Sequence, residues 1–422
     1  MTAPTAEDLI ARAEHAERTG RAREAGEHWI ALISAHPNHP KALFNQGRRR
    51  LEQGDAAAGL ALLAQAEAAD RSNPDAPLFL AMAHRSQGKL GEALAAIDRA
   101  LALDPYYFMA QLSKGSLLEQ MGQKRLAART YGNALKIAPS PERMPGALKA
   151  PYERARIVVA DNAQALAEHL RVCTGEARKR HASADLSRFD EALDILAGLT
   201  KPYFPEPSLL TYPRLPPIPF YDRELFAWFA ALEAATDDIR AELDVVMHED
   251  QHDFAPYIQK RPGEPVNQWA ALNHSRDWSS FFLWRDGVRQ DANCARCPKT
   301  AAALERAPLA HQSGFGPSAL FSLLEPHTHI PPHTGSANSR LIGHLPLVLP
   351  PNCRFRVGNE TRTWRMNEAW VFDDTIEHEA WNDSDEIRVI LIFDIWNPYL
   401  SDAERELVTG MMLALQEYNR AG

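Results

Sequence analysis

Glu325-Pro-His-Thr-His-Ile-Pro-Pro-His-Thr-Gly335 is the stretch that governs our interpretation of the second half of the chain, and Phe372-Asp-Asp-Thr-Ile-Glu-His-Glu379 follows it. The last histidine of the first stretch, His333, precedes His378 of the second by 45 positions. Neutral imidazole suits iron, and non-haem Fe(II) is often held by two histidines and one carboxylate on a single face. We therefore predict that His333 and His378 bind a metal ion.

The third ligand of such a site usually stands two residues after the first histidine. Here that residue is Gly335, which has no side chain to offer. We therefore expect water in the third position and a chelating organic dianion that supplies most of the charge balance. An open metal position of this kind is typical of non-haem iron oxygenases.

Other candidate ligands lie close by in the sequence. His327 and His329 are alternative metal ligands, although support of a turn suits His329 better. Asp373 and Asp374 stand just before His378, and we expect them to hydrogen-bond at the end of a strand rather than to bind metal.

From about residue 265 the pattern changes to short apolar segments broken by Gly, Pro and Asn. Seven of them predict strands: SSFFLW, SALFSLL, RLIGHLPLVLP, RFRV, TRTW, AWVF and EIRVILIFDIW. Many short strands with turn signals between them predict an all-β sandwich or barrel.

Alternation along these strands places polar side chains on faces that are otherwise apolar. Arg340 shares one face with His344, while Arg388 and Ser322 each share a face with aliphatic residues. The far carboxylate of a chelating keto acid would be costly to bury unpaired, so we predict that Arg388 binds it. Ser322 could add a hydrogen bond, and His344 could hold the carboxylate at the metal end. Arg340 is predicted to grip a substrate carboxylate, with pairing to a surface acid as the alternative.

The first 141 residues contain a repeat of 34 positions. Its markers are a glycine at Gly20, Gly54, Gly88 and Gly122, a small residue five positions later at Ala25, Gly59, Ala93 and Ala127, and a closing proline at Pro37, Pro105 and Pro139, with Arg71 in the remaining slot. This period resembles the tetratricopeptide repeat. About four repeats are expected to stack into a curved solenoid that binds peptide or protein. The alternative is a scaffold for oligomerisation or packing.

The predicted fold class is α+β multidomain. Residues 1–141 form the all-α repeat domain, residues 142–215 an accessory helical segment with a Pro-rich linker, and residues 216–422 the catalytic domain. An amphipathic helix is expected over residues 223–247, flanking the sheet.

Composition narrows the class of protein. The formal net charge of -9 argues against a general nucleic-acid binder. No signal peptide and no apolar run long enough to span a membrane is visible. The four cysteines, Cys173, Cys294, Cys297 and Cys353, are too few for a disulfide scaffold, so we expect a reduced, cytoplasmic chain. A redox pair of Cys294 and Cys297 is the less favoured interpretation.

The segments HTGSANSRLIGHLPLVLPPNCRFRVGNETRTW and AWVFDDTIEHEAWNDSDEIRVILIFDIWNP closely resemble the aspartyl/asparaginyl β-hydroxylase family of 2-oxoglutarate oxygenases. The resemblance runs from near Phe220 to about Leu407. It implies a double-stranded β-helix of jelly-roll or cupin-like type, and an iron ion held by two histidines with glycine in place of the acid.

Matched by position, four residues stand where the family surrounds 2-oxoglutarate: Trp278, Ser322, His344 and Arg388. Arg340 matches a residue that contacts the substrate carboxylate. The chain departs from the family at Ile342, where the animal enzyme has a co-substrate arginine, so His344 and Arg388 are expected to carry more of that role.

The implied reaction uses Fe(II), 2-oxoglutarate and O₂ to hydroxylate the β-carbon of Asp or Asn in a peptide or protein docked on the repeats. No protein general base is required. Three alternatives remain: the same chemistry on a non-protein substrate such as a lipid acyl chain, halogenation at iron, and a repeat scaffold with an inactive β domain.

Overall fold

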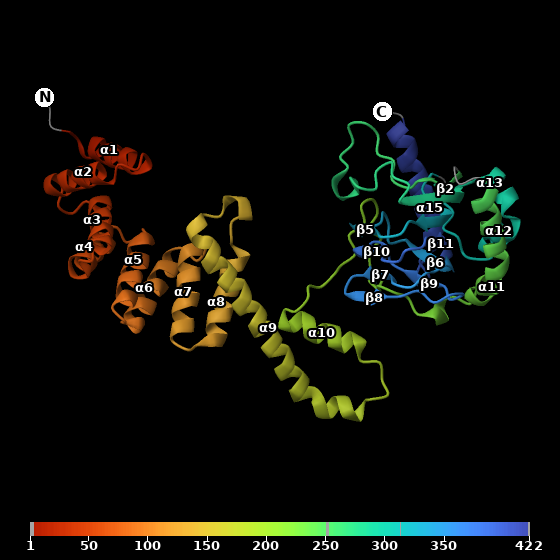
Figure 1. Ribbon diagram of the computed structural model, residues 1–422, viewed down its shortest axis with the longest axis horizontal. Coiled ribbons are helices and arrows are strands. Elements are labelled where there is room, and N and C mark those ends of the chain that lie inside the picture. The colour runs from red at the N-terminus through yellow and green to blue at the C-terminus, as the bar shows by residue number, and fades with distance from the viewer. Residues whose placement is uncertain (1–3, 250–252, 313, 421–422) are drawn as a thin grey trace. The chain divides into compact units, whose positions relative to one another are not determined.

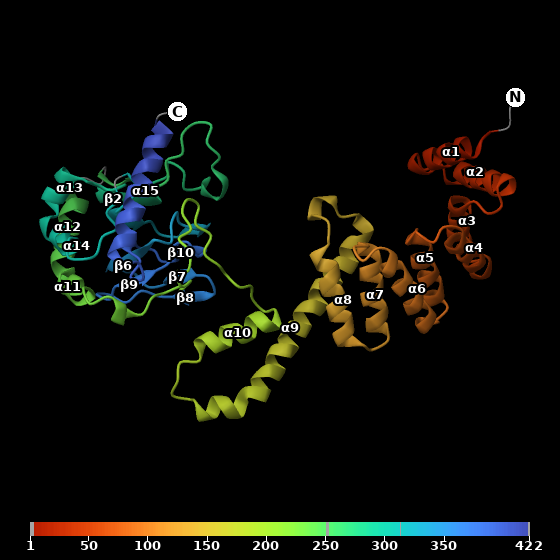
Figure 2. The ribbon, with the colours of Figure 1, turned by 180° about the vertical axis from the view of Figure 1, so that it is seen from behind.

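The computed structural model describes residues 4–249, 253–312 and 314–420. The chain divides into two compact units between Thr200 and Lys201 (Figure 1). The first unit is helical and the second is rich in β structure; Figure 2 shows both from behind.

The first unit begins with eight helices that pack as successive pairs. Their bounds are α1 Ala6–Arg18, α2 Ala22–Ala35, α3 Pro40–Glu52, α4 Ala56–Ala69, α5 Asp75–Ser86, α6 Leu90–Leu103, α7 Phe108–Gln120 and α8 Lys124–Lys136. The four marker glycines end the turn within each pair with φ between +74° and +84°, a backbone conformation that suits glycine. The small residues of the repeat are buried where the paired helices cross. The first unit is thus a helical region of the tetratricopeptide type.

A long helix, α9 (Gly146–Arg180), packs against α8 and is followed by α10 (Ser187–Ala197). Both helices belong to the first unit. The Pro-rich part of the predicted intermediate segment, from Lys201 onward, belongs to the second unit. The segment that we predicted as residues 142–215 is therefore divided between the two units.

Two antiparallel sheets form the second unit. The larger has the strand order β1-β2-β4-β11-β6-β9, with β3 beside β2, and the smaller has the order β5-β10-β7-β8. The bounds of the larger sheet are β1 Ala255–Pro256, β2 Trp278–Arg285, β3 Val288–Arg289, β4 Ala319–Leu324, β6 Arg340–Val348, β9 Trp370–Phe372 and β11 Arg388–Trp396. Those of the smaller sheet are β5 Thr328–His333, β7 Cys353–Val357, β8 Glu360–Arg362 and β10 His378–Asn382.

Strand alternation divides the larger sheet between two cores. On β11, the side chains of Val389, Leu391, Phe393 and Ile395 pack against helices. The helices involved are α11 Phe229–Ala234, α12 Thr236–Glu249, α13 Asp291–Arg296 and α14 Pro298–Leu304. Ile390, on the opposite face, packs against residues of the smaller sheet. The space between the sheets therefore receives Arg340 and His344 from β6 and Arg388 from β11, as the alternation predicted.

Some local expectations require correction. The single helix expected over residues 223–247 is broken into the 3₁₀ turn η2 (Arg223–Leu225), α11 and α12. All four cysteines are free, and Cys294 and Cys297 are buried thiols. None of the helices in the described part of the chain is long and apolar enough to cross a membrane. A final helix, α15 (Asp402–Arg420), packs near Trp396.

The prolines of the Pro-rich segment and of β5 lie where they disturb no ladder. Residues 206–210 bend at Ser208 and Leu209, and Leu210 forms an isolated bridge with Ala337. β5 contains Pro331 and Pro332 and is the edge strand of the smaller sheet, the position where proline is tolerated.

Candidate metal centre

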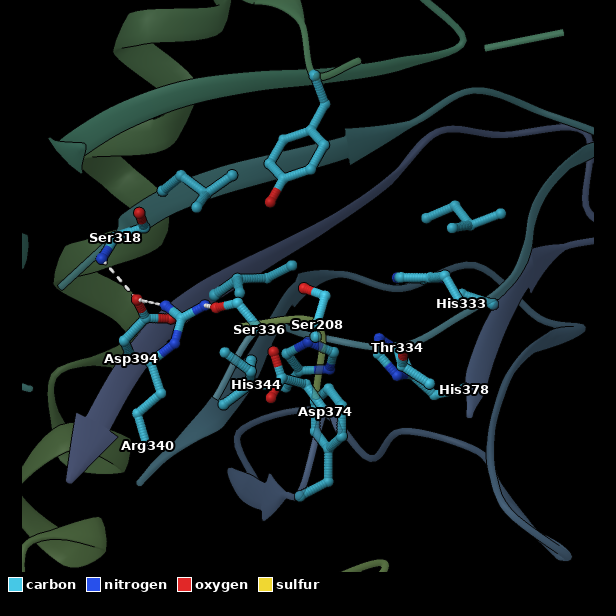
Figure 3. A pocket seen from close by; sticks show the side chains of 18 of the residues that line it. Ser208, Ser318, His333, Thr334, Ser336, Arg340, His344, Asp374, His378 and Asp394 are labelled. Carbon is cyan, nitrogen blue, oxygen red and sulfur yellow. Dashed lines mark hydrogen bonds and ion pairs between the residues drawn. The ribbon is translucent and has the colours of Figure 1, made fainter. Parts of the chain in front are cut away.

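A cavity of about 470 Å³ lies between the two sheets. Six of the seven predicted site residues line it: Trp278, His333, Arg340, His344, His378 and Arg388. In the view of Figure 3, His333 and His378 lie at one end, and Arg340 and Asp394 lie at the other.

The two predicted metal ligands meet across neighbouring strands. His333 ends β5, His378 begins β10, and the two residues are paired in the antiparallel register. Their ring centroids are 4.0 Å apart at an interplanar angle of 54°. Two imidazoles this close can share one ion.

Backbone hydrogen bonds fix the tautomer of both rings. His333 Nδ1 lies 2.8 Å from the carbonyl oxygen of Pro331, and His378 Nδ1 lies 3.0 Å from that of Ile376. A carbonyl only accepts, so each Nδ1 carries the proton and each Nε2 keeps its lone pair. Burial lowers the pKa of His333, and burial followed by the nearby His333 ring lowers that of His378. Both rings are therefore neutral near pH 7, the state that metals bind.

An acid occupies the place where a side chain on Gly335 would project. A Cβ atom on Gly335 would lie 1.9 Å from Oδ2 of Asp374, and the Gly335 N–H donates to the Asp374 carbonyl at 2.6 Å. The Asp374 carboxyl is buried, and its Oδ1 has no hydrogen-bond partner in the described part of the chain. Burial raises the pKa of Asp374 to about 7. The expected turn role fits Asp373, which accepts from Thr375, but Asp374 faces the cavity.

The buried guanidinium of Arg388 has no acidic partner among the residues that the structure describes. Arg388 is 2% exposed, its Nε lacks a hydrogen bond, and it lies 5.1 Å from the centre of the Trp364 ring. Burial lowers its pKa to about 10. The Nδ1 of the neighbouring His344 also lacks a partner in the same part of the chain, and burial followed by Arg388 lowers its pKa. A buried cation of this kind calls for an anion from outside the chain.

Aromatic side chains form the wall beside the histidines. Trp278 stacks on Tyr257 at 4.2 Å, and Trp269 meets His333 edge-on at 4.9 Å. Ser322, the seventh predicted residue, is fully buried, and its hydroxyl accepts a hydrogen bond from Trp278 Nε1 at 3.0 Å. The structure thus gives Ser322 a contact that orients Trp278.

Arg340 is engaged at the far end of the cavity. One guanidinium nitrogen pairs with the buried Asp394, and the other donates to Ser336 Oγ at 2.9 Å (Figure 3). Asp394 also accepts from the Ser318 N–H at 2.8 Å. Arg340 thus forms an ion pair, as the alternative interpretation expected, but its partner is a buried acid and not a surface acid. The other three of the five N–H donors of Arg340 make no hydrogen bond within the described part of the chain.

The two alternative histidines have other partners. His329 stacks on Trp381 at 4.9 Å and 2°, and its Nε2 lies 2.8 Å from Glu379. His327 contacts the exposed Asp385. No group of three or more His, Cys, Asp or Glu side chains is placed to hold a metal ion within the described ranges. A metal between His333 and His378 would therefore have two protein ligands.

Sequence reasoning missed three parts of this site. Asp374 could have been found by asking which acid replaces the one absent at position 335. Tyr257 and Trp269 come from a loop with no strand or helix pattern, and Ser208 and Leu209 come from the Pro-rich segment. No sequence signal that we recognise would have placed these four residues at the cavity.

Comparisons with known proteins match parts of both units. Residues 233–398 match the family model for aspartyl/asparaginyl beta-hydroxylase, and residues 78–107 match that for the tetratricopeptide repeat. The chain is 42% identical over 135 residues to the human protein named aspartyl/asparaginyl beta-hydroxylase, covering 32% of this chain and 18% of that one. It is 36% identical over 197 residues to the ornithine lipid ester-linked acyl 2-hydroxylase of Rhizobium tropici, covering 46% and 66%.

The aligned region thus spans less than a fifth of the human relative and about two thirds of the bacterial one. Among solved structures, a crystal structure of the MamA protein aligns with 46% of this chain at 16% identity and a TM-score of 0.31. A similarity of that size supports no argument.

Proposed function

We propose that the chain is an Fe(II)- and 2-oxoglutarate-dependent dioxygenase, because residues 233–398 match the model of the aspartyl/asparaginyl beta-hydroxylase family. Its proposed reaction is hydroxylation of the β-carbon of Asp or Asn in a peptide or protein. The observation that carries the proposal is a pair of neutral imidazoles at a cavity that also holds the buried guanidinium of Arg388. Neither the Nε2 atoms nor the guanidinium has an acidic partner among the residues that the structure describes. We also propose that the two facing sheets form a double-stranded β-helix within a catalytic region of residues 216–422.

When bound, ferrous iron would activate O₂ at the expense of 2-oxoglutarate, which leaves as succinate and CO₂. His333 and His378 would hold the iron through Nε2. Gly335 contributes no ligand, and the Asp374 carboxyl beside it would accept hydrogen bonds from water in the open position. The donor set fits the metal because both imidazoles are neutral and face one cavity.

The co-substrate would lie against the residues whose polar atoms lack partners. Arg388 is placed to pair with the far carboxylate of 2-oxoglutarate, and His344 with the carboxylate near the metal. Trp278 provides an apolar wall, and Ser322 holds its indole N–H. Ile342 adds no charge to this pocket, so Arg388 carries the recognition of the dianion.

The substrate would enter from the end of the cavity that holds Arg340. Its remaining N–H donors can bind a side-chain carboxylate or amide, as an Asp or Asn residue would present. The helical repeats would dock the rest of the peptide or protein. This division of labour is supported by the tetratricopeptide match and by the compactness of each unit.

A lipid acyl chain is the second candidate substrate. The similarity to the Rhizobium tropici enzyme favours it, and so do the apolar side chains of Leu209, Ile258, Trp269 and Phe315 in the cavity wall. A repeat scaffold with an inactive β domain is the alternative from another class.

Anaerobic titration with Fe(II) and 2-oxoglutarate, followed by succinate release with candidate peptides and lipids, separates these possibilities. The proposal expects both ligands to bind and an Asp- or Asn-containing peptide to stimulate succinate release and gain one oxygen atom. Stimulation by a lipid alone would favour the second candidate. Failure of the chain to bind either Fe(II) or 2-oxoglutarate would favour the third possibility, a repeat scaffold with an inactive β domain.

A further inference from the structure

The segment Glu206–Leu210, which we call the strap, makes backbone hydrogen bonds to both loops that carry the candidate ligands. The Glu206 N–H donates to the carbonyl of Thr375 at 2.7 Å. The Ser208 N–H donates to that of Gly335 at 3.1 Å, and the N–H groups of Leu209 and Leu210 both donate to Ser336 at 3.0 Å.

These carbonyls lie in the loops just beyond the ends of β5 and β10, where the hydrogen-bonded ladder between the two strands has stopped. His333 is the last residue of β5 and His378 is the first residue of β10, so the ladder between them stops at the ligand pair. Gly335 follows the first ligand by two residues, and Thr375 precedes the second by three. The strap is thus a cross-brace between two loops that would otherwise be joined mainly through the hydrogen bond from Gly335 to Asp374.

The sequence of the strap suits this role. Pro205 and Pro207 have no N–H. All four residues of the strap that do have one, Glu206 and residues 208–210, donate it to the two ligand loops. Prolines also reduce the conformational entropy that the free segment would lose on docking. The side chains of Ser208 and Leu209 line the cavity, so the strap is a wall of the site as well. Figure 3 shows Ser208 beside Asp374.

We infer that the strap is a positioning element, which holds the loops of His333 and His378 at the separation that one metal ion requires. This inference rests on the proposed function. It goes beyond it by giving a role at the metal pair to residues that precede the hydroxylase domain in the sequence.

The test removes backbone donors while keeping matched controls. Glu206→Pro deletes the N–H that binds Thr375, whereas Glu206→Ala keeps it; the Glu206 side chain is exposed. Ser208→Pro and Ser208→Ala form the second pair. Co(II) binding to the full chain is followed by its visible absorption in the absence of oxygen. We expect each proline variant to bind Co(II) about tenfold or more weakly than its alanine partner, the range typical of lost contacts behind metal ligands.

Equal Co(II) affinities of the proline and alanine variants within each pair would overturn the inference, whether both bind like the native chain or both bind more weakly. Hydrogen exchange on the native chain provides a test that does not depend on the variants folding. The amides of Glu206 and of residues 208–210 should be protected and should exchange more slowly once Co(II) and 2-oxoglutarate are added. Rapid exchange in both states would contradict the bracing role. If the native chain itself binds no Co(II), that result contradicts the proposed function, on which the bracing role rests.

Discussion

Replacing Arg388 with methionine is expected to stabilise the ligand-free chain while removing its affinity for 2-oxoglutarate. Methionine fills a similar volume without charge, so the change isolates the cost of the buried guanidinium from the cost of a cavity. Arg388 has no acidic partner in the described part of the chain, and in the proposed function the dianion is that partner.

The magnitude follows from the pKa. Burial lowers the pKa of Arg388 from 12.5 to about 10, and each unit corresponds to about 1.4 kcal/mol. Holding the charge at neutral pH therefore costs about 3 kcal/mol. The contact of the guanidinium with the Trp364 ring returns about 1 kcal/mol of this. The free energy of unfolding should thus rise by roughly 2 kcal/mol in Arg388→Met, since the cost of the charge exceeds the ring contact.

Thermal or chemical unfolding with and without 2-oxoglutarate measures both effects. Saturating ligand should stabilise the wild-type chain by about 3 kcal/mol at a hundred times its Kd, and should not stabilise Arg388→Met. Arg388→Lys is the control, because it keeps the charge without the forked donors and should retain a weaker response. The reasoning is refuted if Arg388→Met is less stable than the wild-type chain without ligand, or if its response to 2-oxoglutarate is unchanged.

Three further predictions follow from the site and the repeats. The folded pKa of Asp374 is raised from 3.8 to about 7, so its contribution to stability is complete below pH 4 and is lost as the pH rises through 7. In the presence of a chelator, the free energy of unfolding of Asp374→Asn should therefore rise relative to that of the wild-type chain by up to about 4 kcal/mol between pH 4 and pH 7, as measured by denaturant melts. A difference that stays constant with pH would contradict the burial argument. His378→Ala should weaken Co(II) binding by about a hundredfold or more and abolish succinate formation; retained turnover would remove His378 from the metal site. Deleting residues 1–141 should spare succinate formation without a target but weaken capture of a macromolecular substrate, and undiminished capture would show that the repeats are not the docking surface.

The repeat unit and the strands of the larger sheet could be predicted from the sequence, because both depend on local periodicity. The 34-residue spacing of glycines such as Gly88 reflects a turn that needs positive φ, which is a property of the backbone of each repeat. Alternation along β6 and β11 assigned Arg340, His344 and Arg388 to one face, because side chains alternate wherever a strand is regular. The helix expected over residues 223–247 failed, since its amphipathic pattern does not reveal the breaks between η2, α11 and α12.

The position of His333 was decided by the tertiary structure. Between the pairs Ile330–Ala380 and His333–His378, two residues of β5 face a single residue of β10, so the pairing contains an irregularity with one extra residue. Regular alternation would put His333 on the outer face with His329; the extra residue turns it into the cavity. Such a shift depends on the partner strand and leaves no period in the sequence.

The amino-acid sequence thus shows which side chains are available: two imidazoles, two guanidinium groups on apolar strands and a glycine where an acid is usual. Only the folded chain decided that Asp374 fills the space beside Gly335, that Asp394 pairs with Arg340, and that the strap braces the ligand loops. These contacts join residues that are far apart in the chain. They are set by the packing of two sheets and the strap, which no local pattern encodes.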